Sequence, residues 1–414
     1  MKVLFISEYF PPNVKGGGEI SCFLLAKHLI KRGVEIHVLT SNSKGSKEIE
    51  GINIHRNLKT GKNPSSIFSN IKRTLAFPNS VKKETKKLIR KYNFDIIHYF
   101  NTTSAYGVIK TKIPKIMHSN SPVFFCPKGD LIYKNKSLYD KKINYRDFKK
   151  EFINSKYIAK TKNYFFIKHN PIFRRYLFRA YKKRIKLLKK FDHFLPISNF
   201  LAGRLKLLGV KENKITVMPN IIEIEKFKKT TAKNDKLRIT YLGSYTKFKG
   251  IYTLLKALKK LKRDYVCNLY GAGNIEQEIK KRIEKDNLKV NLNTKRNYQK
   301  IPEVLSKSNV LVFPSEIPEA FGRVLVEAMA AGCIPVSSKI GGTIDIIKDK
   351  KNGYFFEPGN IEQLTEILNK IDLRKIKKEV LIKEAKKYNG EDIAKKVLTA
   401  YKKITNENLN VRRI

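Results

Sequence analysis

The sequence predicts an α/β protein with two doubly wound, Rossmann-like domains. Its 414 residues are enough for two or three domains with separate cores, and 41% of them are hydrophobic. In both halves, short and nearly continuous apolar segments alternate with amphipathic segments of helical period. This alternation is typical of parallel strands joined by crossover helices that cover both faces of a sheet. Each half also opens with a strand, a glycine-containing loop and a helix.

In the N-terminal half the first strand is predicted over 2–7 (KVLFIS), before a Pro-Pro turn. Gly16 and Gly17 then open a helix that Gly33 closes. The other predicted elements are strands over 34–41, 52–57, 95–100, the segment ending near His118, 191–198 and 214–220, and helices over 80–94 and 199–209.

Two features of this half are candidates for ligand binding. A glycine loop before a helix lets the backbone approach a phosphate, although the spacing around Gly16 and Gly17 does not fit GxGxxG and a surface turn is the alternative. His118 follows a strand at the edge where open α/β sheets bind ligands. An ordinary hydrogen-bonded loop histidine is the alternative there.

The segment from about 141 to 190 interrupts the alternation. It mixes Lys and Arg with Phe, Tyr and Ile, and its acids are Asp147 and Glu151. Across the chain, 87 Lys and Arg face 36 Asp and Glu, a formal net charge of +51. Contact with an anionic membrane surface is one hypothesis, and a pair of basic helices laid over the sheet is the other. No nucleic-acid-binding module is recognised, and no nucleic acid partner is expected.

The C-terminal half begins after a basic linker, with a strand over 237–242 and a loop, 243–250, that carries Lys247 and Lys249 near a helix N-terminus. Lysine suits a phosphate as a point charge. Further predicted elements are strands 265–270, 290–295, 310–313 and 334–338, a glycine-started helix over 340–349, a turn and strand over 352–360, and helices 301–308, 361–371 and 393–404.

The segment from Val310 to Glu327 is central to this half. A strand ends at Pro314, a polar elbow follows, and a helix begins near Gly322. Glu319 lies on the elbow and Glu327 lies eight residues later in the helix. Two carboxylates so placed can contact two parts of one extended ligand, while an exposed loop acid and a helix-face acid are the alternative.

Cysteine usage and hydropathy indicate the compartment. Four cysteines stand apart with no CxxC pair and no metal-ligand spacing, so we expect free thiols. No apolar run is long enough to span a bilayer, and the N-terminus reads as a strand rather than a signal peptide. We expect a cytoplasmic protein, peripheral on the inner face of the cell membrane if the basic segment binds lipid.

Several motifs of the second half occur in the order found in one enzyme family. They are GSYTKFKGI, PSEIPEAFGRVLVEAMAAG, IGGTID and NGYFFEPG. With Glu319 and Glu327 as its E-x7-E motif, the chain resembles the retaining GT-B glycosyltransferases of the family-4 type. The resemblance is strongest over about 237–360, and it is weaker but consistent over 1–40, 95–130 and 191–220.

The resemblance implies the GT-B fold: two Rossmann-like domains facing across a cleft, over 1–222 and 236–388, with a C-terminal helix (389–414) that crosses back to the first domain. It implies metal-independent transfer of a sugar, of the hexosyltransferase type, from a UDP- or GDP-sugar to an acceptor hydroxyl with retained configuration. The acceptor would be lipid-linked or a glycan, in the synthesis of a surface polysaccharide, glycolipid or glycan. No cofactor is expected.

The resemblance also assigns roles to residues. Glu319 and His118 would contact the donor sugar, Glu319 with the backbone of Phe321 and Gly322 beside it. Glu327 would accept hydrogen bonds from the ribose. Lys247 and Lys249 would contact the diphosphate of the donor. Gly16 and Gly17 would let the N-terminal loop approach either that diphosphate or the acceptor.

Three positions depart from the family pattern. Ser244 stands where an Arg usually follows the loop glycine, Ile221 replaces a glycine after Pro-Asn, and Asp345 replaces Glu. The alternatives of another class are a GT-B nucleotide-sugar epimerase and a basic nucleic-acid-binding protein. A dehydrogenase is disfavoured, because neither half has GxGxxG with an acid about 20 residues further on.

Overall fold

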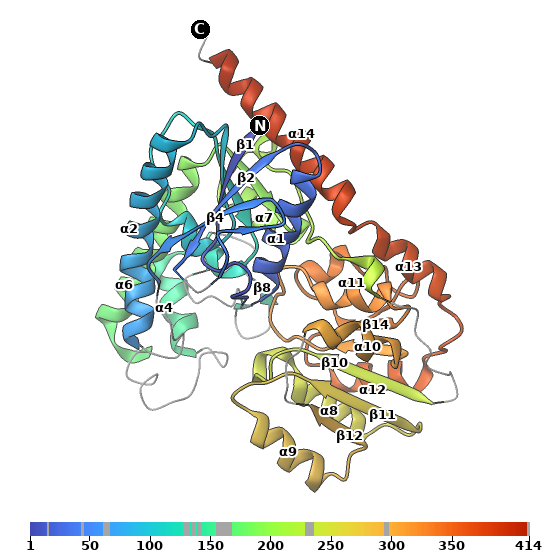
Figure 1. Ribbon diagram of the computed structural model, residues 1–414. Helices are drawn as coiled ribbons and strands as arrows, with labels where there is room; N and C mark the ends of the chain where they lie inside the picture. Colours follow the sequence, from blue (N-terminus) through green and yellow to red (C-terminus); the bar gives the residue numbers. More distant parts are fainter. Residues whose placement is uncertain are drawn as a thin grey trace. The chain divides into compact units, whose positions relative to one another are not determined.

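The computed structural model describes residues 1–14, 16–42, 45–60, 67–126, 132–133, 137–138, 142–154, 168–227, 236–293 and 298–411. The chain divides into two compact units (Figure 1). Unit 1 comprises residues 1–221 and 390–414, and unit 2 comprises residues 222–389. Each unit is built around its own largely parallel sheet.

The sheet of unit 1 has the order β3-β4-β2-β1-β5-β6-β9 and is parallel except for the β3–β4 pair. Its strands are β1 (Lys2–Ile6), β2 (Glu35–Ser41), β3 (Glu48–Ile49), β4 (Ile52–Leu58), β5 (Ile96–Tyr99), β6 (Lys115–Ser119) and β9 (His193–Pro196). A separate two-stranded sheet joins β7 (Ile132–Tyr133) and β8 (Ser137–Leu138). The central strands are buried on both faces, which explains why they read as continuous apolar runs.

Among the described residues of unit 1, the helices are α1 (Gly17–Ile30), α2 (Ile67–Lys91), α3 (Thr102–Ala105), α4 (Tyr145–Asn154), α6 (Pro171–Leu187), α7 (Asn199–Leu207) and α14 (Gly390–Val411). Helices α1 and α14 pack together against one face of the sheet, and α2 lies on the other (Figure 1).

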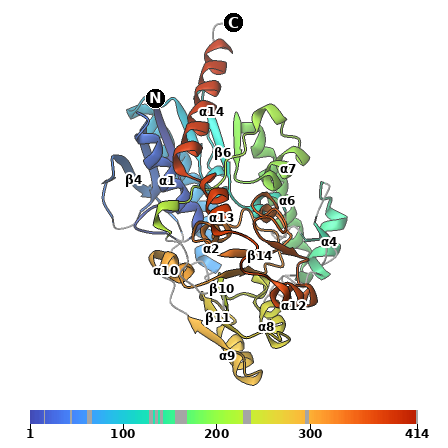
Figure 2. The ribbon, with the colours of Figure 1, turned by 90° about the vertical axis from the view of Figure 1, so that its right-hand side faces the viewer.

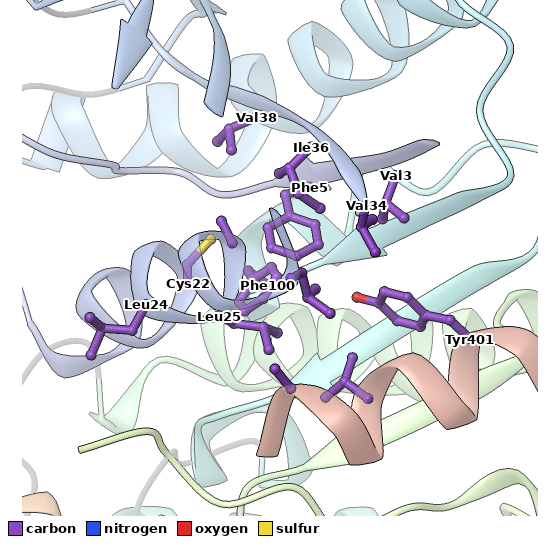
Figure 3. Close-up of a cluster of buried hydrophobic side chains, with 14 of the residues drawn as sticks. Val3, Phe5, Cys22, Leu24, Leu25, Val34, Ile36, Val38, Phe100 and Tyr401 are labelled. Carbon is purple, nitrogen blue, oxygen red and sulfur yellow. The ribbon is translucent and has the colours of Figure 1, made fainter. Parts of the chain in front are cut away.

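The last helix completes the core of unit 1. Buried side chains from the C-terminal end of the chain, among them Val397 and Tyr401, join those of α1 and of the central strands in one hydrophobic cluster (Figure 3). The hydroxyl of Tyr401 lies 2.6 Å from Nδ1 of His98 on β5. Helix α14 is therefore tied to the sheet by apolar packing and by a buried hydrogen bond.

The sheet of unit 2 has the order β12-β11-β10-β13-β14-β15, with every pair parallel. Its strands are β10 (Leu237–Leu242), β11 (Tyr265–Tyr270), β12 (Val290–Asn293), β13 (Val310–Phe313), β14 (Ile334–Ser338) and β15 (Tyr354–Phe356). Its helices are α8 (Ile251–Lys259), α9 (Glu276–Lys285), α10 (Ile301–Ser306), α11 (Arg323–Ala330), α12 (Ile361–Lys370) and α13 (Lys378–Lys386). Helices α8 and α12 lie side by side (Figure 2), as do α11 and α13.

Both sheets have a topological switch point, where the chain stops adding strands on one side and starts adding them on the other. In unit 1 it lies between β1 and β5, and in unit 2 between β10 and β13. The loops that leave the carboxyl ends of two such strands run to opposite sides of the sheet and leave a crevice that suits a ligand. The doubly wound fold predicted for each half is thus confirmed.

Helix α2 begins at Ile67, well before the helix predicted over 80–94, and two other predicted elements are much shorter in the structure. The strand predicted over 214–220 is reduced to an isolated bridge between Phe194 and Ile215. The N–H groups of Thr216 and Met218 also donate hydrogen bonds to carbonyl groups of β9. Pro196 of β9 has no N–H to donate in return, so the ladder cannot continue.

The helix predicted over 340–349 is a single 3₁₀ turn, Gly342–Asp345. The amide of Asn352 donates to the carbonyl of Ile346 and accepts from the N–H of Lys348. Because this side chain occupies the backbone groups that a longer helix would use, the helix ends after one turn.

Glycines allow the loops of unit 2 to approach each other at the carboxyl edge. Gly250 has φ +66°, and a Cβ there would lie 1.7 Å from the carbonyl oxygen of Pro314 at the end of β13. A Cβ at Gly271 would lie 1.9 Å from the carbonyl oxygen of Gly243. The loop after β10 therefore packs, backbone to backbone, against the loops after β11 and β13.

We predict that Gly250→Ala destabilises the protein by about 2 kcal/mol or more, from the left-handed conformation and the displacement of the Pro314 carbonyl. The measurement is calorimetric unfolding of the full chain. Gly203→Ala is the matched control: Gly203 lies inside α7 with nothing within 4 Å of its would-be Cβ, so this change should raise stability slightly. Equal transition temperatures for Gly250→Ala and the wild type would contradict the prediction.

Candidate functional site

The candidate site of unit 2 lies at its switch point, where the loop 243–250 after β10 meets the elbow 314–322 after β13. The N–H of Glu316 donates to the carbonyl of Phe248 across 2.9 Å, and Thr253 Oγ1 of α8 donates to Glu316 Oε1 across the same distance. These bonds, with the close approach at Gly250, fix the two loops against each other.

This arrangement brings two of the predicted residues into contact. Lys249 Nζ lies 2.6 Å from Glu319 Oε1, although the two residues are 70 positions apart in the chain. Ser315 Oγ donates to the same carboxylate oxygen across 2.7 Å. The side chains of Lys249 and Glu319 are 29% and 15% exposed, so the pair is partly open to solvent and accessible to a ligand.

The backbone of Glu319 is held by the double glycine that follows β14. Glu319 and Gly341 form an isolated parallel bridge, and the N–H of Gly342 donates to the carbonyl of Glu319 across 2.8 Å. A Cβ at Gly341 would lie 2.4 Å from that carbonyl oxygen, and one at Gly342 would lie 2.4 Å from the carbonyl oxygen of Ala320. The IGG motif is thus a support on which the elbow rests.

The elbow leads into α11 through Gly322, which has φ +106°. Phe321 before it is buried and packs edge-to-face on Tyr388, with ring centroids 5.5 Å apart. The side chain of Phe321 therefore anchors the elbow in the core, and only its backbone is suited to a ligand.

Glu327, the second acid of the motif, is fully buried on α11. Its Oε1 accepts a hydrogen bond from Arg323 Nε, one helical turn earlier, across 2.7 Å. Breaking a buried ion pair by removing one partner typically costs about 3–5 kcal/mol, so this pair also supports the helix.

The second predicted lysine of the loop does not join the first. Lys247 Nζ lies 3.8 Å from Glu278 Oε2 on α9, and its side chain is 63% exposed. The structure therefore distinguishes two lysines that the sequence treats alike: Lys249 contacts Glu319, and Lys247 faces α9.

In unit 1 the predicted residues gather near the switch point between β1 and β5. Gly16 and Gly17 lie exposed at the start of α1, and the carboxylate of Glu19 accepts from the N–H of Gly16 across 2.8 Å. A Cβ at Gly18 would lie 2.9 Å from Nδ2 of Asn120, two residues after His118. The glycine loop and the end of β6 are thus neighbours.

His118 lies inside an aromatic stack. Its ring is stacked on Phe100 at 4.7 Å between centroids and tilted against His98 at 5.4 Å. The side chain is buried, and neither of its ring nitrogens has a hydrogen-bond partner among the described residues. Burial lowers the pKa of His118 to about 3, and it lowers the pKa of His98 well below the usual value, with a smaller contribution from His118. Both rings are neutral at pH 7.

These buried rings predict acid sensitivity. In the unfolded chain His118 binds a proton below pH 6.5, whereas in the folded protein it stays neutral down to about pH 3, so stability falls as the pH drops below 6.5. The loss at pH 5 is about 2 kcal/mol for one such group.

We therefore expect His118→Phe, which retains an aromatic ring in the stack, to flatten the fall in unfolding temperature between pH 7 and pH 5. The control is His169→Gln, a change at an exposed position. If both variants follow the wild-type pH profile, burial of His118 does not limit acid stability.

Sequence reasoning missed two residues of the candidate site. Arg323 was detectable, because it stands four positions before Glu327 and so faces it on a helix. Ser315 carried no such signal, because it reaches Glu319 through the shape of a loop.

Neither a membrane-spanning helix nor a metal-binding cluster occurs among the described residues. Residues 1–14, 16–42, 45–60 and the later described ranges contain no helix long and apolar enough to cross a membrane. In the same ranges, no group of three or more His, Cys, Asp and Glu residues is arranged to hold a metal ion. The four cysteines are free and buried.

Comparison with solved structures identifies the fold. A crystal structure of HepE from Anabaena, in complex with UDP and glucose, superposes with a TM-score of 0.69 at 18% identity, covering 97% of this chain and 100% of that one. Together with the two doubly wound sheets, this similarity shows the fold of the GT-B glycosyltransferases.

Family models cover nearly the whole chain. The model described as Glycosyltransferase Family 4 matches residues 15–226, and Glycosyl transferases group 1 matches residues 223–388. The chain belongs to glycosyltransferase family 4.

Two curated relatives match part of the chain. An uncharacterized glycosyltransferase of Methanocaldococcus jannaschii is 28% identical over 170 residues, which are 40% of this chain and 48% of that protein. The capsular polysaccharide biosynthesis glycosyltransferase CapM of Staphylococcus aureus is 31% identical over 181 residues, 39% of this chain and 47% of that protein. The matched regions span about half the length of each relative.

Proposed function

We propose that the protein transfers a sugar from a nucleoside diphosphate sugar to an acceptor hydroxyl with retained anomeric configuration. The observation that carries this proposal is the contact of Lys249 with Glu319 at the switch point of unit 2. Membership of glycosyltransferase family 4 supports it.

The pair matches the chemistry of such a donor. A nucleotide-sugar places anionic phosphate oxygens directly beside the hydroxyl groups of the sugar. A cation suits the phosphate and a carboxylate suits the hydroxyls, so adjacent Lys249 and Glu319 offer complementary partners to adjacent parts of one molecule. The lysine also shields the carboxylate from the phosphate charge that would otherwise repel it.

Departure of the nucleoside diphosphate concentrates negative charge on the leaving oxygens. A fixed ammonium at Lys249 stabilises that charge in place, without reorganisation at the moment of reaction. Same-face attack by the acceptor requires positioning more than a protein nucleophile, so Glu319 serves to hold the sugar. In this proposal no metal ion is required.

The remaining predicted residues complete the donor site. The backbone of Phe321 and Gly322 lies next to Glu319 on the elbow. The family resemblance also assigns donor contacts to Gly16, Gly17 and His118 of unit 1. Glu327 binds the ribose in this proposal, and its pairing with Arg323 holds it in one orientation. The role given to each of these residues follows the family resemblance.

The acceptor is a hydroxyl of a growing glycan or of a lipid-linked sugar. CapM, the Staphylococcus aureus relative, is named for capsular polysaccharide biosynthesis, which supports a role in making a surface polysaccharide. HepE was crystallised with UDP and glucose, which makes UDP the first nucleotide to test, ahead of GDP.

We predict that Lys249→Ala weakens UDP binding about tenfold or more, because it removes a charge-assisted contact to the diphosphate. Lys247→Ala removes the same charge two residues away and should weaken it less, since Lys247 faces α9. Calorimetric titration with UDP and with uridine separates the effects: uridine lacks the diphosphate, so its affinity should not change. Equal losses for the two lysine variants would contradict this assignment.

Glu319→Gln should reduce kcat/KM for sugar transfer tenfold to about a hundredfold, because a neutral amide accepts weaker hydrogen bonds from the donor sugar. A screen of UDP- and GDP-sugars, with released nucleotide as the readout, measures this. Glu327→Gln should reduce the upward shift in melting temperature that UDP gives to wild type. The proposal fails if neither UDP nor GDP shifts the melting temperature of the wild-type protein.

A nucleotide-sugar epimerase is the second candidate within the same fold. It would isomerise the donor with no acceptor present, so chromatography of a UDP-sugar incubated with the protein alone distinguishes the two. An isomerised nucleotide-sugar would favour the epimerase, whereas free UDP and unchanged remaining donor favour the transferase.

A further inference from the structure

Helix α6 of unit 1 presents an unusually basic face. Residues 168–190, which include this helix, contain ten Lys and Arg and no Asp or Glu. The side chains of its exposed face recur at intervals of three and four residues, so they form one continuous stripe. The stripe consists of Ile172, Arg175, Tyr176, Arg179, Lys182, Lys183 and Lys186.

The opposite face of α6 is fixed in the protein. Phe178 and Tyr181 are buried, and the Phe178 ring stacks on Phe148 of α4 at 5.6 Å between centroids. Asn170 caps the helix by accepting from the N–H groups of Ile172 and Phe173. The stripe is therefore held on a rigid support and does not depend on a partner to become helical.

The cations of the stripe are not neutralised within the part of the chain that the structure describes. There, no ion pair joins Arg175, Arg179, Lys182, Lys183 or Lys186 to an acidic side chain. By contrast, Lys249 and Arg323 in unit 2 are each paired with a glutamate. An uncompensated row of positive charge fits an extended anionic surface.

Two exposed apolar side chains at the start of the stripe distinguish between anionic surfaces. Ile172 is 76% exposed and Tyr176 is 54% exposed, one helical turn apart. A branched aliphatic side chain gains nothing against a phosphate backbone in water. It gains by burial at the boundary between lipid headgroups and acyl chains, where an aromatic hydroxyl also fits. The helix is about 25 Å long, enough to lie along a bilayer.

We propose that the exposed face of α6 is a membrane-docking surface for an anionic phospholipid bilayer, with the cations on the headgroups and Ile172 and Tyr176 in the interface. This surface belongs to unit 1, whereas Lys249 and Glu319 belong to unit 2, and the proposal goes beyond sugar transfer. Docking would bring the enzyme to acceptors that are themselves held in a bilayer.

The test is sedimentation of the full chain with phosphatidylcholine vesicles and with vesicles that also contain phosphatidylglycerol. We expect binding only to the anionic vesicles at about 0.1 M salt and loss of most binding at about 0.5 M. Lys182→Glu with Lys183→Glu should lower the partition coefficient about tenfold or more. Ile172→Ser should lower it without changing the net charge.

The matched control is Lys395→Glu with Lys396→Glu on α14, an adjacent exposed pair in the same unit that changes the net charge equally. It should leave vesicle binding within about twofold of wild type. Equal losses in the two double variants, or no binding to anionic vesicles, would overturn the proposal. A third combined result would also overturn it. In that result, duplex DNA displaces the vesicles and binds through Lys182 and Lys183, and the Ile172→Ser variant binds vesicles as well as the wild type does.

Discussion

The close approach of two backbone segments at the carboxyl edge of unit 2 is the constraint on which the candidate site depends. Gly250 lies so near the carbonyl of Pro314 that no side chain fits between them, and the Glu316–Phe248 hydrogen bond holds the same two loops together. Without this contact the loop that carries Lys249 would not be held beside the elbow that carries Glu319. Gly250 therefore fixes the position of the charged side chain of its neighbour, Lys249.

The site combines rigid support with partial exposure. Glu319 is held through its side chain by Ser315 and through its backbone by Gly342, while its carboxylate remains partly open. Positioning of this kind suits a reaction that depends on placing a donor and stabilising a leaving group. Glu327 differs from Glu319, because its side chain is fully buried and paired with Arg323. It is supported by the structure but is less accessible to a ligand.

The sequence was most informative where burial dictates composition and least informative where one side chain competes with the backbone. The strands β1, β10, β13 and β14 are apolar because both faces are covered, and their positions were predicted to within one residue. The strand predicted over 214–220 failed because Pro196 on its neighbour cannot donate. The helix predicted over 340–349 failed because Asn352 binds the groups that would extend it.

The same distinction applies to the site. The motif spacing pointed to Glu319 and Lys249, whose roles remain predictions, and the structure brings them into contact. The sequence could not distinguish Lys249 from Lys247, because both lie on the same short loop. Their side chains point in different directions only because of the conformation of that loop. The contact from Ser315 depends on the same three-dimensional detail.

The placement of α14 has a consequence for biosynthesis. Unit 2 is one uninterrupted stretch of chain, whereas the core of unit 1 includes Val397 and Tyr401, which are translated after all of unit 2. The sheet of unit 1 therefore cannot complete its core until unit 2 has been translated, and the surface that α14 covers stays exposed until then. Unit 2 can fold as soon as its own residues have been translated, whereas unit 1 cannot complete its fold until α14 has been made. During that interval the face of α1 that packs on α14 is exposed, and a chaperone would be needed there.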